Sequence, residues 1–428
     1  MLMTDDSAPF LDAFHQRLGE EGPAWLAPRR QAGMDRFATL GFPTRRQEAW
    51  RFTDLTPLTD ALPSSAPSTV APIAGDLASW LLDGPTHRVV LVDGRVASAT
   101  TDGLPAGAWL GSLADALRTR PDLADGIFDD GGGAFAALNA ALFSDGVVLA
   151  LDPGVVLERP VEIIHHASVD AASHVRLHLA LGAGARATVV ETAAGGGAGW
   201  GNQVTTVALA AGAVLRHVHI QAEGPAARHT ALVRAVLGDG ARYDAFALIT
   251  GGRLSRRDVE VTLAGDAAAF ALHGAYLLRD AQEATLAVRA DHHGRDCRTE
   301  QGVKGVLAGA SHGVFLGTVA VRPGADGTDA RQLNRNLLLS PTARIDTKPE
   351  LEILADDVKC SHGATVGSLD EASLFYLQAR GIDPETARRM LVAAFAGDVV
   401  DAAGLPGPVA DLVHRHLQHW LHGEGGEA

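Results

Sequence analysis

The chain has 428 residues but few cysteines, few aromatic residues and no long apolar run. Cys297 and Cys360 are the two cysteines, so a disulfide framework is excluded and a reducing, cytoplasmic environment is expected. No apolar run reaches the roughly 18 residues of a membrane span, and the acidic N-terminus lacks a secretion-signal pattern. The formal net charge of −15 opposes binding to nucleic acid or to an anionic membrane.

The sequence also lacks the motifs of two large enzyme classes. It contains no Gly-x-x-x-x-Gly-Lys-Ser/Thr phosphate loop, so we do not expect the chain to hydrolyse ATP by itself. Gly309-x-Ser311-x-Gly313 matches the nucleophile elbow of serine hydrolases, but that elbow requires a helix directly after it. The residues that follow have the apolar pattern of a strand. A glycine-rich turn is therefore the favoured interpretation, and a hydrolase acting through Ser311 is the minor alternative.

Short β-rich runs separated by turn signals occupy residues 147–367, which we predict to be the core of the fold. A Leu-x-x-Gly-Ala phrase recurs, first at intervals of 28 residues and then in weaker copies, beginning at Leu181, Leu209, Leu237, Leu263, Leu307 and Leu339. No helix of ten or more residues separates these runs, which disfavours alternating strands and helices. Repeats of this length are typical of strands stacked coil on coil. We predict a mainly β fold built as a β-helix (β-solenoid), with a β-sandwich as the alternative.

Helical periodicity appears at both ends of the chain. Residues 1–70 are expected to form an N-terminal helical region that ends in a Pro- and Ser-rich linker at 62–71. Residues 71–146 are expected to be a mixed α/β lead-in to the β-helix. Residues 368–428 return to a helical pattern and form the expected C-terminal helical domain.

This C-terminal region contains signals for helix boundaries. Ser368 and Glu371 have the spacing of a capping box, and Gly381 fits a left-handed stop. Asp383 followed by Pro384 is typical of the start of the next helix. We therefore expect at least two helices after the β-helix.

The densest polar segment, residues 351–367, contains Cys360 and His362 two positions apart. In a strand, both side chains would lie on the same face. A thiolate and an imidazole on one face can be paired ligands for iron or zinc, or a thiolate–imidazolium pair that carries sulfur. An inert buried cysteine beside a surface histidine is the plain alternative.

The number of cysteines limits what this chain can bind alone. Iron–sulfur clusters and zinc sites usually take about four ligands, and the two cysteines are 63 residues apart in sequence. Any cluster here would need histidine or carboxylate ligands, or residues from another chain. A second and weaker candidate is Cys297, with Asp291, His292 and His293 near it in sequence.

The remaining histidines gather in two patterns. One C-terminal helix is expected to carry His414, His416, His419 and His422. A metal site is the alternative there, and a solvated polar face is the favoured interpretation. Probable strands carry His165, His166, His217 and His219, which we interpret as hydrogen-bonded, partly buried histidines.

Three segments of the sequence resemble a known protein family. Residues 336–382, which include Cys360-Ser-His362-Gly, resemble the C-terminal signature of the SufB/SufD family, the scaffold subunits of the SUF iron–sulfur cluster assembly system. Residues 304–332 are similar to the preceding coils of that family. Residues 46–55 (RQEAWRFTDL) are similar to the pattern that opens SufD chains. This pattern, the chain length and the scarcity of cysteine favour the SufD type over the SufB type.

The resemblance implies a fold, partners and site residues. It implies a right-handed parallel β-helix with helical flanks, in a complex in which a SufD-type chain pairs with SufB and each binds the ATPase SufC. Sulfur would arrive from a cysteine desulfurase, and a nascent cluster would form at the subunit interface. His362 matches the family's interface histidine, and Cys360 is the neighbouring thiol. Phe375, Tyr376 and Arg380 correspond to the region that docks SufC.

The resemblance also leaves some points open. A reduced flavin is linked to the complex, but no residue of this chain is assigned to it. Phe375 and Tyr376 have the alternative of covering the end of the β-helix. A SufB-like scaffold, which would be homodimeric, is the nearer alternative function, and the isolated chain could likewise pair with itself. A β-helix enzyme acting on carbohydrate is the more distant one. On the favoured reading the chain is a scaffold without catalysis of its own.

Overall fold

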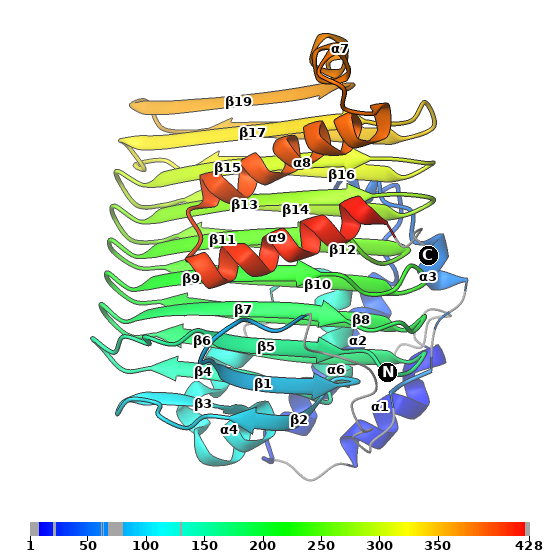
Figure 1. Cartoon of the computed structure of the whole chain (residues 1–428). Coiled ribbons are helices and arrows are strands. Elements are labelled where there is room, and N and C mark those ends of the chain that lie inside the picture. The colour runs from blue at the N-terminus through cyan, green and yellow to red at the C-terminus, as the bar shows by residue number, and fades with distance from the viewer. Residues whose placement is uncertain are drawn as a thin grey trace.

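The computed structural model describes residues 8–19, 23–60, 62, 64–66, 80–128 and 131–423. Two sheets, one of ten strands and one of nine, face each other along the length of the molecule. The chain passes from one sheet to the other in successive coils, which gives the stacked ladder of Figure 1. The predicted mainly β solenoid with helices at both ends is confirmed.

Strand order follows the coils directly. The ten-stranded sheet has the order β19-β17-β15-β13-β11-β9-β7-β5-β1-β2, and the nine-stranded sheet has the order β18-β16-β14-β12-β10-β8-β6-β4-β3. The strands are β1 (His87–Val92), β2 (Arg95–Thr100), β3 (Ala108–Ser112), β4 (Asp145–Leu151), β5 (Val161–His166), β6 (Ala172–Leu181), β7 (Arg186–Ala194), β8 (Trp200–Leu209), β9 (Val214–Gln221), β10 (Arg228–Leu237), β11 (Arg242–Ile249), β12 (Leu254–Leu263), β13 (Ala269–Leu278), β14 (Glu283–His292), β15 (Arg298–Leu307), β16 (His312–Val321), β17 (Thr328–Leu338), β18 (Arg344–Ile353) and β19 (Val358–Gly367). Within the described ranges, antiparallel pairing is confined to the first coil, where β2 pairs with β1 and β3 pairs with β4.

The repeated phrase marks one corner of the solenoid. Leu181, Leu209 and Leu237 end successive strands of the nine-stranded sheet and lie in register with one another. The glycine three residues after each of them has a positive φ, as at Gly184 (φ 68°), where residues with a Cβ are disfavoured. The amide of Gly184 donates to the carbonyl oxygen of Ala211 in the next corner, at 2.8 Å. The 28-residue interval is therefore the length of one coil.

Two of the weaker copies belong to the opposite corner. Leu307 ends β15, a strand of the ten-stranded sheet, and the copy at Leu339 follows β17 of the same sheet. The interpretation of these copies as units of one series is wrong. Both corners need a strand end, a tight turn and a buried small residue, so similar residues occur at each.

Helices of the N-terminal part cover the outer face of the nine-stranded sheet over its first coils. They are α1 (Leu11–Leu18), α2 (Leu26–Leu40), α3 (Thr56–Thr59), α4 (Leu113–Thr119), α5 (Ala124–Ile127) and α6 (Ala134–Leu142), with short 3-10 turns at Ala8–Phe10, Glu48–Trp50 and Pro121–Leu123. Phe37, Leu138 and Trp200 belong to one buried cluster that joins α2 and α6 to β8. The expected linker at 62–71 falls mostly outside the described residues.

Three helices follow the solenoid: α7 (Glu371–Ala379), α8 (Pro384–Ala403) and α9 (Gly407–His422). Helices α8 and α9 lie across the outer face of the ten-stranded sheet (Figure 1). Apolar side chains such as Val218 and Phe246 from the sheet and Val399 and Leu412 from the helices form the contact. No residue of α7 is buried.

The helix boundaries partly match the predicted signals. Asp383 caps α8 by accepting from the amides of Glu385 and Thr386, with Pro384 in the first turn, as predicted. The prediction of a capping box formed by Ser368 and Glu371 is wrong. Asp370 caps α7 instead, accepting from the amide of Ser373 at 2.7 Å, because an aspartate nearer the helix satisfies the same free N–H groups.

Candidate functional site

The segment with Cys360 and His362 forms β19, the last strand of the ten-stranded sheet. Among the described strands its one neighbour in the sheet is β17, with Cys360 in register with Ala330 and His362 in register with Gln332. Ala330 and Gln332 are buried, and Ala330 belongs to the apolar core between the sheets. Residues in register point to the same face. Both candidate ligands therefore face the interior of the solenoid at its open end.

The two side chains differ in exposure. His362 is exposed, whereas Cys360 is partly buried and packs against the core cluster. Burial raises the pKa of the Cys360 thiol, and the nearby Asp329 carboxylate raises it further. A thiol with a raised pKa is protonated at neutral pH. Burial at this position therefore disfavours the thiolate that a thiolate–imidazolium pair requires.

The open end leaves both sheets unfinished. In the described part of the chain, β18 and β19 are each paired on one side only. Residues that stack above one another and face the interior also end there in partly exposed apolar side chains. Ile353 on β18 is 37% exposed, and Val366 on β19 is 50% exposed. Unpaired strand edges beside uncovered apolar groups are typical of surfaces that add strands from another chain.

The donor set at the open end fits only part of a metal site. No group of three His, Cys, Asp or Glu side chains in the described ranges could hold a metal ion. Cys360 and His362 can supply two ligands of the soft and borderline kind that iron accepts. A cluster with about four ligands needs the others from elsewhere.

The weaker candidate around Cys297 does not form a site. Cys297 is fully buried, its thiol donates to the carbonyl oxygen of Gly265 at 3.2 Å, and burial raises its pKa. His292 is buried and contacts Thr299 through Nε2 at 2.8 Å. Asp291 is instead paired with Arg289 and Arg322. Cys297 is thus a small core residue.

The C-terminal histidines lie on α9, as predicted. His416 is buried under the ring of Trp80, with ring centroids 4.8 Å apart, and burial lowers the pKa of His416 to about 4. His419 lies beside the same Trp80 ring at 6.5 Å. These contacts make His416 part of the helix packing.

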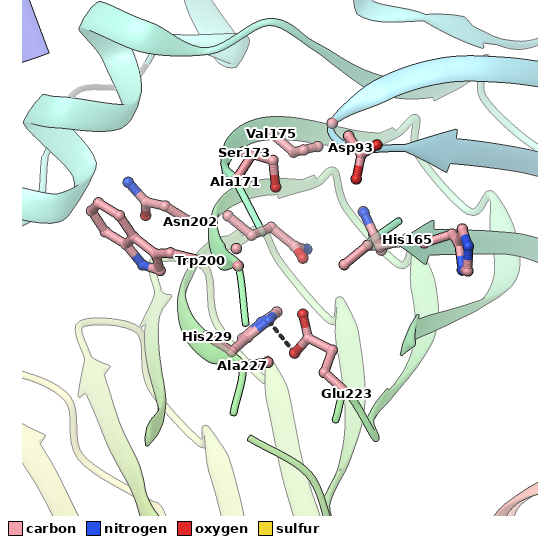
Figure 2. Close-up of a pocket in the computed structure, with 16 residues that line it drawn as sticks. Asp93, His165, Ala171, Ser173, Val175, Trp200, Asn202, Glu223, Ala227 and His229 are labelled. Carbon is pink, nitrogen blue, oxygen red and sulfur yellow. Dashed lines mark ion pairs between the residues drawn. The ribbon is translucent and has the colours of Figure 1, made fainter. Parts of the chain in front are cut away.

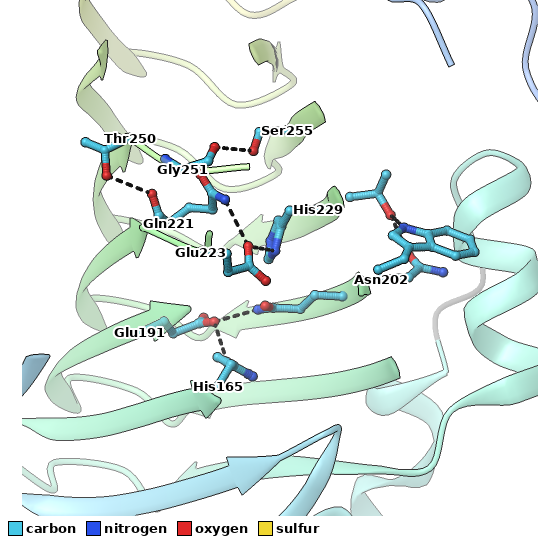
Figure 3. Close-up of polar contacts among 12 residues, drawn as sticks. His165, Glu191, Asn202, Gln221, Glu223, His229, Thr250, Gly251 and Ser255 are labelled. Carbon is cyan, nitrogen blue, oxygen red and sulfur yellow. Dashed lines mark hydrogen bonds and ion pairs between the residues drawn. The ribbon is translucent and has the colours of Figure 1, made fainter. Parts of the chain in front are cut away.

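The structure also contains a polar cluster inside the solenoid that the sequence did not predict. Glu191 is fully buried and contacts His165 at 3.3 Å and His217 at 2.5 Å, while Gln203 donates to it at 2.5 Å. Glu223 pairs with His229 at 2.9 Å (Figure 3). Charge attraction and hydrogen bonds from His217 and His165 outweigh burial and hold the pKa of Glu191 well below its usual value.

A cavity of about 40 Å³ lies beside this cluster. Asp93, His165, Glu223 and His229 surround it (Figure 2), and a cavity of this size has room for a few water molecules. His217 is hydrogen-bonded, as interpreted from the sequence, but His219 has no hydrogen-bond partner in the described part of the chain. In the sequence, the signal for this cluster was the pairing of histidines within strands, at His165 with His166 and at His217 with His219.

Helix α7 presents an exposed aromatic surface. Phe375 is 74% exposed and Tyr376 is 59% exposed. Arg380 lies over the Tyr376 ring at 5.2 Å and donates to its hydroxyl at 3.2 Å. The alternative that Phe375 and Tyr376 cover the end of the solenoid is wrong, because both rings point largely to solvent.

Two further features concern the serine-hydrolase alternative and membrane-spanning helices. Ser311 is buried in a turn before β16 and no helix follows it, so the nucleophile-elbow alternative is wrong. No helix in the described ranges has the length and apolarity for a membrane span.

Comparisons with known proteins agree with this geometry. A protein-family model described as "SUF system FeS cluster assembly, SufBD core domain" matches residues 163–395. The chain is 29% identical over 404 residues to the iron–sulfur cluster assembly protein SufD of Escherichia coli, an alignment that covers 93% of each chain. It is 30% identical over 415 residues to a SufBD family protein of Synechocystis, covering 92% of this chain and 90% of the relative. A chloroplastic protein of Arabidopsis thaliana is 32% identical over 396 residues, covering 87% of this chain and 81% of the relative.

Proposed function

This chain belongs to the SufBD family of SUF iron–sulfur cluster assembly proteins, and we propose that it is a SufD-type scaffold that pairs with a SufB-type chain and binds a SufC-type ATPase. Its role is to complete a site for a nascent cluster at the interface of the two scaffolds. The cluster is cargo that is assembled and passed on.

One observation carries this proposal: the solenoid ends in two free strand edges, and one of the two edge strands carries a thiol and an imidazole that face inward. Cys360 and His362 lie on β19, and the described residues offer no third donor close to them. A partner that adds a strand to β18 or β19 would cover the exposed core end and bring its own ligands. Strand addition thus couples pairing of the chains to completion of the site.

The chemistry assigned to this chain is modest. The His362 imidazole, exposed in the isolated chain, supplies a nitrogen ligand to iron at the interface. Cys360 remains a thiol until a metal or a partner cation lowers its pKa, because burial disfavours the thiolate. ATP hydrolysis comes from the partner, since the sequence has no phosphate loop.

Helix α7 is the surface that we assign to the ATPase. Phe375 and Tyr376 are large aromatic residues with no cover, and Arg380 braces the Tyr376 ring. Exposed aromatic and arginine side chains are the common anchors of protein interfaces. Because α7 follows β19 within a few residues, a movement of α7 on ATP-driven closure would reach the strand with the ligands.

A homodimer is the second candidate. Two copies that join through their β19 edges would together present two thiols and two imidazoles, the number of ligands that a small cluster takes. This alternative needs no second scaffold chain.

Purification of the full chain with an affinity tag from its own cells tests both. Recovery of a larger SufBD homologue and an ATPase subunit in a fixed ratio supports the heteromeric scaffold. Recovery of a homodimer that holds an iron–sulfur chromophore without other chains would contradict it and favour the second candidate.

A further inference from the structure

Buried amide side chains lie directly beneath the open end of the solenoid. In the two coils of the ten-stranded sheet beneath β19, inward positions are taken by Gln301 on β15 and by Gln332, Asn334 and Asn336 on β17, each at most 3% exposed. The same column one coil earlier holds Leu272, in register with Gln301. Buried amides cost free energy unless they are hydrogen-bonded. Buried amides lower in the solenoid have such partners, as Gln203 and Gln221 show by donating to Glu191 and Glu223. Those near the open end therefore need partners as well.

Most of these amides have found partners. Tyr276 donates its hydroxyl to Oδ1 of Asn336 at 2.6 Å, and Asn336 donates to Oδ1 of Asn334 at 2.6 Å. Asn334 donates to the carbonyl oxygen of Val303 at 3.2 Å. This part of the layer is a closed hydrogen-bonded group.

Gln301 and Gln332 are different, because each keeps one buried polar atom without a partner in the described part of the chain; in Gln301 this atom is Nε2. Gln332 donates its Nε2 to Oε1 of Gln301 in the coil below, at 3.2 Å. Its Oε1 is buried and has no hydrogen-bond partner in the described part of the chain. Because the amide nitrogen is engaged with the coil below, the oxygen of the same group is left for a donor in the coil above. The residue in register with Gln332 in that coil is His362.

We propose that Gln332 is a positioning residue for His362: its Oε1 accepts a hydrogen bond from one N–H of the imidazole, which leaves the lone pair of the other ring nitrogen directed at the open end. This inference rests on the proposed role of His362 as an iron ligand. Histidines that bind metals usually donate their other N–H to a fixed oxygen acceptor, which sets the tautomer and the ring orientation. Cys360, by contrast, lies over Ala330, whose side chain offers no polar group.

The tautomer of His362 is the direct readout. The full chain is labelled with ¹⁵N-histidine, and long-range ¹H–¹⁵N spectra above pH 8 report which ring nitrogen carries the proton. The His362 signal is identified by its loss in His362→Ala. We expect a single dominant tautomer in the wild type, a shift toward the mixture of free histidine in Gln332→Met, and the wild-type pattern in Gln332→Glu, which keeps the acceptor.

Asn334→Leu is the matched control. Asn334 lies two residues from Gln332 on the same strand, is equally buried, and is in register with Ala364 instead of a ligand. We expect this variant to leave the His362 tautomer unchanged. An identical His362 pattern in the wild type and Gln332→Met would overturn the inference.

A second measurement separates this inference from the proposed function. In the complex reconstituted with its partners, we expect Gln332→Met to lower the iron–sulfur yield by about tenfold, the lower end of the loss when a residue that orients a metal-binding histidine is removed. If the tautomer changes in Gln332→Met but His362→Ala leaves the yield unchanged, the positioning contact stands and the proposed function fails. If His362→Ala abolishes the yield while Gln332→Met leaves both the yield and the tautomer unchanged, only the positioning inference is lost.

Discussion

Nε2 of His217 lies 2.5 Å from Oε1 of Glu191 in the interior of the solenoid, and neither side chain is more than 1% exposed. His165 contacts the other carboxylate oxygen of Glu191 at 3.3 Å. A buried carboxylate is tolerated only with such partners, because the free energy of desolvation is otherwise large. The pair therefore predicts how the stability of the fold depends on charge and pH.

We expect Glu191→Gln to lower the free energy of unfolding by about 3–5 kcal/mol at pH 7, because it leaves His217 without its carboxylate partner. The folded pKa of Glu191 is lowered, so its stabilising effect is present above the unfolded value of about 4.5 and is lost as the pH falls below it. Urea unfolding at pH 7 and in acid measures both effects. The exposed pair of Glu48 and Lys348 is the control, and Glu48→Gln should leave the stability nearly unchanged, because solvent screens this pair. Equal effects of the two substitutions would contradict the prediction.

A second pH effect comes from His178, which is buried and contacts Thr206 at 2.8 Å. Burial lowers the pKa of His178 from 6.5 to about 4. Since the unfolded chain takes up a proton at a higher pH than the folded chain, stability falls as the pH drops below about 6.5. We expect the wild type to lose about 2 kcal/mol more than His178→Gln between pH 7 and pH 5. Parallel stability curves for the two proteins would rule this out.

The two cysteines should differ in reactivity. Cys360 is partly buried with a raised pKa, and Cys297 is fully buried with a raised pKa. In the native chain we expect iodoacetamide to label Cys360 more slowly than free cysteine at pH 8, with a rate that rises with pH, and to leave Cys297 unlabelled. Mass spectrometry of Cys360→Ser, which should take up no label until denatured, is the control. Rapid labelling of Cys360 at pH 7 would mean that a thiolate is present after all.

The aromatic surface of α7 is expected to serve binding and not folding. Phe375→Ala and Tyr376→Ala should leave the melting temperature within about 2 °C of the wild type, because exposed side chains contribute little to stability. Both should greatly reduce copurification of the ATPase subunit. Val236→Ala, at a residue 46% exposed on β10, is the control and should retain the partner. Retention of the ATPase by the α7 double variant would remove this helix from the interface.

His362→Ala is expected to reduce the iron–sulfur yield of the reconstituted complex at least tenfold, as loss of a ligand does. Ser361 is adjacent on the same strand, and its side chain points to the opposite face. Ser361→Ala should therefore keep the wild-type yield. Iron and sulfide analysis together with the visible absorption of the cluster measures the outcome. An unchanged yield in His362→Ala would exclude this residue as a ligand.

The sequence predicted the repeating part of the fold well. The 28-residue intervals between Leu181, Leu209 and Leu237 equal the register of the paired strands, because parallel coils place equivalent residues above one another. The placement of Cys360 and His362 on one face of a strand follows from the two-residue alternation of side chains along a strand. These predictions depend only on local backbone geometry, which a sequence pattern carries directly.

Contacts between distant segments could not be read in this way. Trp50 lies under the guanidinium of Arg256 at 3.7 Å, and Thr53 contacts Thr285 at 2.9 Å. The N-terminal residues 46–55 therefore bind along the outer face of the nine-stranded sheet, more than two hundred residues away in sequence. Nothing in either segment alone specifies the other, because such pairing depends on which faces the folded solenoid leaves open.

The sequence by itself determined the coil length, the strand periodicity and the scarcity of metal ligands, since each is a property of residue order and composition. Only the tertiary structure decided that Glu191 meets His165 and His217, that Gln332 is left with a free oxygen beneath His362, and that α7 is uncovered. These features arise from the stacking of coils and from the point at which the stack ends. The last coil has no successor within the described residues, so its strand edges and inward side chains are available to another chain.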